Sequence, residues 1–400
     1  MATNAKNLAE LLNTDTTVKV GDIEDGSVTT AKLANDAVTA AKLADDSVVT
    51  ANISAGAIEG TGVSLGRRNH IINGNFSIAQ RATSASSSAG QYVSLDRWKT
   101  WVSGAATTFS QQTFSPGQTD VPATVGDKYA RLVIGSNSGN GDYSTLSHHI
   151  ENVTLSNSQQ MTLSFYAKAS TGGMKIGIEP IQNFGSGGSP SSRVLIAGTA
   201  KTLTTSWARY THTFTYGSIS GKTLGTDANS SNFEIGFWFS GGSDYNSRTG
   251  SIGNQTGTFE IAGVQLENGD TATDFEHRTI SEEFALCQRY FQKMGPFNTS
   301  DYPFGISGYV YGAVNSAIGA ILNMPMRIDS PTVSMPEGNM HIRHSGNSNT
   351  AIGISAINNL SGALSGSVRM DVSHTSTTNG TICVMTNAQT LYTLRFDAEL

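Results

Sequence analysis

The sequence has few cysteines and few charged residues. Only Cys287 and Cys383 occur among 400 residues, far apart and outside any metal-ligand spacing. This excludes a disulfide framework and a zinc knuckle, and it favours two buried free thiols. Charged residues make up 14% of the chain and the net charge is −6, so the basic surface that a nucleic-acid backbone selects is missing. We therefore expect no nucleic-acid partner.

Long hydrophobic runs are also missing. The start, MATNAKNLAELL, lacks the apolar core and cleavage site of a signal peptide, and no apolar stretch approaches the roughly 20 residues that cross a bilayer. We expect synthesis in a cytoplasm and no membrane insertion. Abundant Gly, Ser, Thr and Asn instead favour many short strands and turns, and hence a mostly β fold.

Aromatic residues are absent before Phe76, and this region repeats. Aliphatic residues recur there at every fifth position, a step that fits neither a helix face nor a strand face. The ten positions are Val18, Ile23, Val28, Leu33, Val38, Leu43, Val48, Ile53, Ile58 and Val63. Burying one such side chain stabilises by about 1.5 to 3 kcal/mol, against about 1 to 2 kcal/mol of backbone entropy for each ordered residue. A single copy of residues 18–66 therefore cannot fold alone.

The repeat predicts an elongated shaft shared by identical chains. Winding around a common axis brings each aliphatic side chain against its symmetry mates, as neighbour contacts stabilise repeat arrays. A seam of single side chains closes readily on a threefold axis, so we expect a homotrimer with these ten residues as its core. A disordered acidic linker is the alternative. Residues 1–17, with a short amphipathic helix candidate in NLAELLNTD, form the predicted attachment segment.

Two segments after the repeat alternate apolar and polar residues as half-buried strands do. The apolar positions are Met161, Leu163, Phe165 and Ala167 in the first segment and Phe233, Ile235, Phe237 and Phe239 in the second. Such strands need a second sheet over their apolar faces, and loops rich in Gly, Ser and Asn separate further strand candidates at sandwich-like spacing. We expect a β-sandwich over residues 67–276.

A connecting helix is predicted within residues 277–295. Thr279 and Glu282 have the spacing of a capping box, which marks a helix start. The residues expected on its buried face are Phe284, Cys287, Tyr290 and Phe291. Residues 296–400 return to alternating strand patterns, which predict a C-terminal β domain at the tip.

No catalytic constellation, metal site or cofactor motif is visible. His148 and His149 are adjacent and face opposite ways in a strand, so they cannot hold one ion together. Paired carboxylates for glycoside cleavage would come from distant strands, which sequence spacing does not reveal. We expect a protein that is not an enzyme and that has no cofactor and no metal.

Sugar binding needs exposed aromatic rings beside hydrogen-bonding groups, because a pyranose stacks on a ring while its hydroxyl groups need polar partners. Tyr166 and Trp238 lie on the outward faces of the two predicted strands, and Tyr245 lies in the polar loop GGSDYNSRTG. The candidate ligand-binding residues are Tyr166, Trp238, Asp244, Tyr245, Asn246 and Arg248. The alternative is that the strand-face aromatic residues pack on a neighbouring protomer or under a long loop.

Several stretches resemble tail-fibre proteins of tailed bacteriophages. The tandem units GSVTTAKLANDAVTAAKLADDSVVT (26–50) are similar to the shaft repeats of these fibres. A widespread module of these fibres is similar to RRNHIINGNFSIAQR (67–81), DRW (96–98), LSFYAKAS (163–170), SWARYTHTF (206–214) and, most specifically, AGVQLENGDTATDFEHRTISEEFALCQRYFQK (262–293). ILNMPMRIDSPTVSM (321–335) is similar to the short-strand signature of a C-terminal domain in the same proteins.

The resemblance implies a virion fibre whose central module is a jelly-roll similar to carbohydrate-binding domains. Its implied partners are phage tail proteins at the N-terminus and host surface polysaccharide or lipopolysaccharide. The favoured hypothesis is a receptor-binding tail fibre without catalysis. A polysaccharide depolymerase and a purely structural head or neck fibre are the alternatives.

Overall fold

The computed structural model of the chain describes residues 67–87, 89–297, 307–312, 315–334, 340–344, 352–374, 382–387 and 392–400. All of these residues belong to one unit, Ser64–Leu400. The attachment segment 1–17 and the ten shaft positions from Val18 to Val63 lie outside the described residues, so those predictions stay predictions. No helix in the described ranges is long and apolar enough to cross a membrane.

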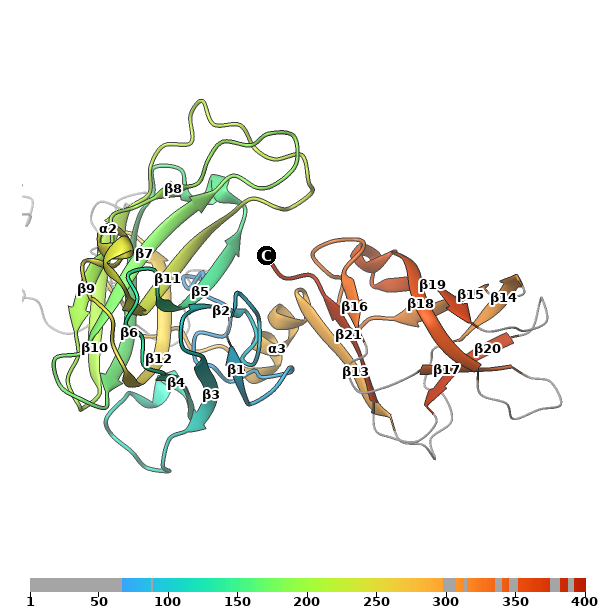
Figure 1. Ribbon diagram of the computed structural model, residues 1–400, viewed down its shortest axis with the longest axis horizontal. Coiled ribbons are helices and arrows are strands. Elements are labelled where there is room, and N and C mark those ends of the chain that lie inside the picture. Colours follow the sequence, from blue (N-terminus) through green and yellow to red (C-terminus); the bar gives the residue numbers. More distant parts are fainter. Residues whose placement is uncertain are drawn as a thin grey trace, which may run out of the picture. The chain divides into compact units, whose positions relative to one another are not determined.

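Two antiparallel sheets form a β-sandwich, so the protein is mostly β as predicted (Figure 1). Sheet A contains, in spatial order, β1 (Ser84–Ser87), β3 (Thr107–Thr113), β4 (Lys128–Ile134), β12 (Gly257–Asn268), β6 (Gln160–Ala169) and β10 (Ala208–Thr215). Sheet B contains β2 (Trp98–Ser103), β5 (Tyr143–Glu151), β11 (Asn232–Gly241), β7 (Lys175–Asn183) and β8 (Val194–Leu195), with β9 (Thr199–Thr202) also paired to β7. Short helical segments in the connections are η5 (Ala123–Val125), η6 (Val153–Ser156), η7 (Ser243–Tyr245) and α2 (Asn246–Thr249).

The hydrophobic core lies between the two sheets, and the predicted alternation of two strands is confirmed. Met161, Leu163, Phe165 and Ala167 of β6 are buried in the same apolar cluster as Phe233, Ile235, Phe237 and Phe239 of β11. Trp98 anchors one end of this core, where its Nε1 donates to the Asn73 carbonyl at 2.9 Å. Because side chains alternate along a strand, Glu234, Gly236 and Trp238 lie on the outer face of sheet B.

Buried asparagines tie the first described residues to a segment about two hundred positions later. The backbone N–H of Asn69 donates to Glu276 Oε2 at 2.8 Å, and the backbone N–H of Asn73 donates to Glu283 Oε2 at 2.7 Å. Arg278 NH1 donates to the other oxygen of Glu283 at 2.9 Å. These bonds satisfy buried polar groups of an irregular segment, which would otherwise cost stability. The strings RRNHIINGN and DFEHRTISEE therefore close the sandwich at this end.

The predicted helix is α3 (Ile280–Gln288), and its predicted cap is confirmed. Thr279 Oγ1 accepts a hydrogen bond from the Glu282 amide at 3.3 Å. Three of the four residues predicted on the buried face are buried, namely Cys287, Tyr290 and Phe291, and Cys287 is a free thiol. The prediction is wrong at Phe284. Phe284 is 39% exposed because the stripe of Glu283 and Cys287 faces inward instead, drawn there by the ion pair of Glu283. The other two residues of the predicted face, Tyr290 and Phe291, lie beyond the helix end, and Phe291 begins the next strand.

Two further sheets follow α3. A small sheet contains β13 (Phe291–Phe297), β21 (Tyr392–Asp397) and β16 (Thr332–Ser334), in the order β13-β21-β16. Six strands close on themselves in the order β14 (Ser307–Gly312), β15 (Asn315–Ile321), β19 (Ser367–His374), β18 (Ile352–Ser361), β17 (Met340–His344) and β20 (Ile382–Asn387), with η8 (Ala363–Ser365) before β19. The last residue of β21 and the residues after it contact the sandwich, since Glu399 pairs with Arg97 and Arg81 NH2 lies 2.8 Å from Asp397 Oδ2.

Candidate functional site

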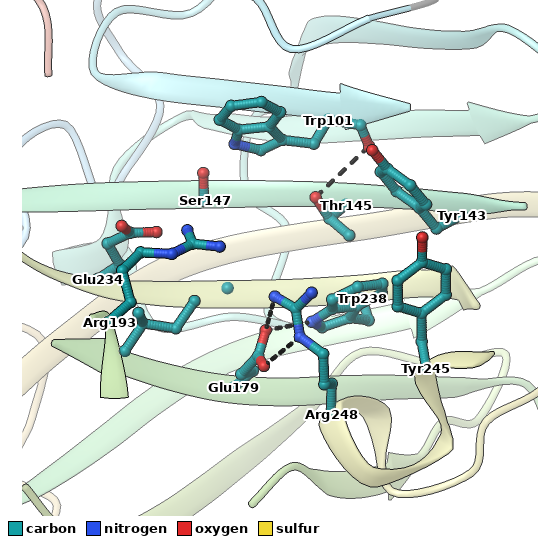
Figure 2. Close-up of a pocket in the computed structure, with 12 residues that line it drawn as sticks. Trp101, Tyr143, Thr145, Ser147, Glu179, Arg193, Glu234, Trp238, Tyr245 and Arg248 are labelled. Atoms are coloured by element: carbon teal, nitrogen blue, oxygen red, sulfur yellow. Dashed lines mark hydrogen bonds and ion pairs between the residues drawn. The ribbon is translucent and has the colours of Figure 1, made fainter. Parts of the chain in front are cut away.

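The outer face of sheet B is hollowed around the middle of β11. A pocket of about 200 Å³ lies there, lined by Trp101, Tyr143, Thr145, Ser147, Glu179, Ile181, Arg193, Glu234, Gly236, Trp238, Tyr245 and Arg248 (Figure 2). Four strands of the sheet contribute to its floor, and the segments around η7, α2 and β8 form its rim.

The strand register explains why the face is hollow at this point. Gly236 of β11 lies opposite Ser147 on one side and Glu179 on the other, so two small residues are adjacent at the centre. Bulkier side chains flank them, with Trp238 two residues further along β11 and Glu234 two residues back. A Cβ on Gly236 would lie 3.4 Å from the Glu179 carbonyl oxygen, which is an ordinary contact, and the backbone there is not left-handed. The backbone at position 236 does not require a glycine. The lack of a side chain there instead leaves space in the pocket.

Aromatic rings form one end of the pocket. Trp238 and Tyr245 have ring centroids 5.2 Å apart, and Tyr143 lies 5.8 Å from Trp238. Tyr245 reaches this position because the chain turns back over β11 through η7 directly after the strand ends. At the opposite wall, Trp101 of β2 is 39% exposed (Figure 2). A flat, partly apolar ligand can therefore lie between aromatic surfaces.

A buried carboxylate fixes the position of the aromatic floor. Glu179 of β7 is 1% exposed and accepts from Arg248 through both oxygens, at 2.6 Å from Nε and 2.9 Å from NH2. The indole Nε1 of Trp238 donates to Glu179 Oε2 at 3.1 Å. The guanidinium of Arg248 lies 4.9 Å from the Trp238 ring centroid, so cation–π attraction adds to the ion pair. The side chains of Arg248 and Trp238 are thereby held in position before a ligand binds.

Charged groups form the other end of the pocket. Glu234 of β11 is 4% exposed, and burial raises its pKa against the opposing effects of Arg193 and Lys99. His149 Nε2 lies 3.6 Å from Glu234 Oε2, but burial, followed by the charges of Lys99 and Arg97, lowers the pKa of His149 well below its ordinary value. His149 is therefore neutral at neutral pH, and this contact is not an ion pair.

Arg193 is the exposed cation of this end. It immediately precedes β8 and its guanidinium points into the pocket beside Glu234 (Figure 2). Within the described ranges the Arg193 side chain has no hydrogen bond and no ion pair within 4.0 Å. Its attraction to Glu234 therefore acts over more than 4.0 Å.

The structure brings three of the six sequence-predicted residues together. Trp238, Tyr245 and Arg248 line the pocket. Trp238 is only 4% exposed, contrary to the expected open ring, because Tyr245 and Arg248 cover it. Asp244 and Asn246 are exposed on the same rim but do not line the pocket.

Tyr166 lies on the opposite sheet. It belongs to β6 of sheet A, where it packs beside a second apolar cluster that includes Phe114, Val125 and Phe275. This matches the alternative in which a strand-face aromatic residue packs under a long loop. Tyr166 is therefore not part of the pocket on sheet B.

Several pocket residues were missed by the sequence analysis. They are Trp101, Tyr143, Glu179, Arg193 and the carboxylate of Glu234. One signal was present for Glu179, because IGIEPI (176–181) places a single charge inside an otherwise apolar stretch. Burying a charge is costly unless it is paired, so such a residue is a candidate for an ion-pair network or a site.

The adjacent histidines have structural roles. His148 faces the interior, where its Nε2 lies 3.0 Å from the Ile72 carbonyl oxygen, and burial lowers its pKa well below the ordinary value. His149 faces the outer side of the same sheet. Among the residues that the structure describes, no three His, Cys, Asp or Glu side chains come together as a possible metal site.

No protein-family model matches the sequence, and a search of curated proteins finds no similar sequence. Solved structures are similar over about half of the chain. A CBM4 structure is 17% identical with a TM-score of 0.28, over 49% of this chain and 98% of that chain. A family 11 carbohydrate-binding module from Clostridium thermocellum, in complex with a β-1,3-1,4-mixed-linked tetrasaccharide, is 11% identical with a TM-score of 0.27, over 49% and 99%. The enzymatically active domain of bacteriophage CBA120 tailspike protein 4 is 13% identical with a TM-score of 0.28, over 50% and 21%.

Proposed function

We propose that this protein is a bacteriophage tail fibre that binds a host cell-surface glycan in the sheet B pocket, without cleaving it. The receptor is a polysaccharide or lipopolysaccharide, and the protein resides in the virion. One observation carries the glycan-binding part. The pocket combines exposed aromatic surface with fixed hydrogen-bonding groups in one small hollow.

The chemistry of sugars suits this combination. The C–H face of a pyranose packs on Trp101 or Tyr245, while its hydroxyl groups find donors in Arg248 and acceptors in Glu234. The pocket is largely preformed, because Arg248 and Trp238 are both held by Glu179. A preformed site lowers the entropy lost on binding.

The fibre part of the proposal is supported by the sequence. The five-residue repeat predicts a trimeric shaft, and the tandem units and the module between residues 67 and 293 resemble phage tail fibres. Residues 1–17 would attach the shaft to tail proteins, and the β domains would face the host. A single sugar site is weak, with an affinity near the millimolar range, yet three linked sites raise avidity by orders of magnitude.

The absence of catalysis is part of the proposal. Glycoside cleavage needs one carboxylic acid and one free carboxylate on either side of the bond. In this pocket both oxygens of Glu179 are held by Arg248 and Trp238, so Glu179 is poorly placed to attack a sugar or to activate water.

The binding test uses the full-length protein and polysaccharides prepared from host-type cell surfaces. Gly236→Val adds an isopropyl group to the pocket floor at a position where a Cβ makes only ordinary contacts. We expect unchanged thermal unfolding and at least about tenfold weaker binding by calorimetry. Gly172→Val is the matched control, because a Cβ there meets no atom within 4 Å and lies in the loop between β6 and β7. Equal binding by both variants would overturn the assignment of the pocket.

The same incubations separate the alternatives. New reducing ends in the polysaccharide would support a depolymerase instead. Binding to virion proteins with no binding to any surface polysaccharide would support a structural head or neck fibre.

A further inference from the structure

We propose that the sheet B pocket binds an acidic sugar, a uronic or sialic acid unit whose carboxylate lies against Arg193. This inference rests on the proposed function and names its ligand class. It goes beyond aromatic stacking and hydroxyl recognition, which any neutral sugar satisfies.

The first support is the difference between the two arginines of the pocket. Arg248 is neutralised by a two-point ion pair with Glu179, at 2.6 Å and 2.9 Å. Arg193 has no such partner among the described residues, although it points into the same pocket (Figure 2). An arginine fork has the geometry that a carboxylate fills with two parallel hydrogen bonds.

The second support is the distribution of charge on this face. Lys99, Arg193 and Arg248 are cations on this face, and the charge of Arg248 is paired with Glu179. Lys99 lies on β2 next to the pocket, with its Nζ 4.4 Å from the Trp101 ring centroid. Its Nζ also contacts the Leu400 carbonyl oxygen, at 3.3 Å. A ligand carboxylate at Arg193 would be attracted by Arg193 and by the nearby Lys99.

Glu234 does not already occupy the place of the ligand carboxylate. Its side chain is buried in the floor and lies more than 4.0 Å from the Arg193 guanidinium, since no ion pair joins them. Burial also raises the pKa of Glu234, which disfavours its charged form. Glu234 is therefore placed to form a hydrogen bond with a sugar hydroxyl beside the ligand carboxylate.

The arrangement sets an orientation for the sugar. The aromatic rings of Tyr143 and Tyr245 lie at the end of the pocket opposite Arg193 (Figure 2). A sugar that packs on the aromatic end directs a carboxylate at its far side toward Arg193. A planar carboxylate can accept two parallel hydrogen bonds from the Arg193 guanidinium. A neutral hydroxymethyl group at the same position can accept only one.

The test compares each acidic glycan with its own neutral counterpart. The probes are polygalacturonate, polyglucuronate and polysialic acid, each before and after chemical reduction of its carboxyl groups, which keeps the linkages unchanged. We expect at least one native acid to bind full-length protein about tenfold more tightly than its reduced form, and this preference to weaken at high salt. Comparing the affinity for polysialic acid with the affinities for the two polyuronates shows whether the carboxylate belongs to a sialic acid or to a uronic acid.

Two variants with the same change of charge assign the effect to Arg193. Arg193→Gln should lose the preference for the native acid while it binds the reduced form as the wild type does. Arg209→Gln removes one cation from β10 of the opposite sheet and should keep the preference. Equal binding of native and reduced forms, or an unchanged preference in Arg193→Gln, overturns the inference while the proposed glycan function stands. If neutral glycans bind and no acidic probe does, the inference is likewise wrong. If no glycan of either kind binds, the proposed function itself fails.

Discussion

Arg248 and Glu179 form a two-point ion pair that joins a rim helix to the sheet beneath the pocket. Nε lies 2.6 Å from Oε1 and NH2 lies 2.9 Å from Oε2, and the carboxylate also accepts from Trp238. Glu179 is 1% exposed, so its charge has little contact with water. The pair therefore supports both the stability of sheet B and the position of the aromatic floor.

Replacing Arg248 by methionine should destabilise the sandwich strongly. Arg248→Met leaves the buried Glu179 carboxylate without its cation, which costs about 3 kcal/mol of unfolding free energy. Glu179→Gln combined with Arg248→Met removes the charge as well and should recover part of that loss. Urea unfolding of the two single variants and the double variant measures this coupling. A loss below about 0.5 kcal/mol in Arg248→Met would show that the pair is not important for stability.

Trp101 should contribute to binding and little to stability. Trp101→Ala removes an exposed stacking surface, so we expect about tenfold weaker glycan binding and a change in unfolding free energy within about 1 kcal/mol. Tyr166→Ala is the control, because Tyr166 is a half-buried aromatic residue on the opposite sheet. Calorimetric titration of both variants with the same polysaccharide checks this. Equal losses in the two variants would place the glycan elsewhere.

Asp96 should make the sandwich less stable as the pH rises from about 4 to about 6. Burial raises the pKa of Asp96 to about 6, from 3.8 for the ordinary carboxyl, although Arg81 and Gln80 act in the opposite direction. Between these values the folded protein holds a proton that the unfolded chain has released. Raising the pH therefore lowers the unfolding free energy by up to about 3 kcal/mol.

The variant Asp96→Asn isolates this effect. Its stability relative to the wild type should increase between about pH 4 and about pH 7, as measured by denaturant unfolding at several pH values. His148 and His149 act with the opposite sign, because their lowered pKa values make the protein less stable at acid pH. They are present in both proteins and cancel in the difference. A difference that does not change with pH would contradict the raised pKa of Asp96.

The repeat predicts the mass of the particle. Three copies of the 42.1 kDa chain give 3 × 42.1 kDa, or about 126 kDa, by sedimentation equilibrium. Leu43→Asp places a charge at a predicted axial position and should shift the protein toward monomers, because three buried carboxylates would repel one another. Lys42→Asp, next to it, is the control and should stay trimeric. A wild-type particle of 42 kDa would disprove the shaft.

The sequence predicted the faces of strands well and their partners poorly. Alternation in β6 and β11 is local, so it correctly placed Phe165 and Phe237 in the core. The same alternation predicted that Tyr166 and Trp238 both face outward and made both of them candidates for one binding site. The two residues lie on different sheets. Which sheet a strand joins depends on pairing between segments far apart in the sequence, and no local pattern encodes that pairing.

The pocket was predicted only in part for a related reason. Tyr245 and Arg248 were found because their loop is polar and aromatic, whereas Trp101, Glu179 and Arg193 come from three other segments. The exposure of Trp238 was wrong because the covering side chains belong to a segment that turns back over the strand. Local signals also gave the start of α3 correctly, since a cap depends on neighbouring residues.

The bonds from Asn69 to Glu276 and from Asn73 to Glu283 also set an order of events during synthesis. A ribosome must translate about two hundred codons after residue 73 before the partners of these asparagines emerge. At about 5 to 20 residues per second, the nascent strands wait for tens of seconds without their closing segment. During that interval the unpaired strand edges are exposed, so we expect the nascent sandwich to need chaperones that shield them.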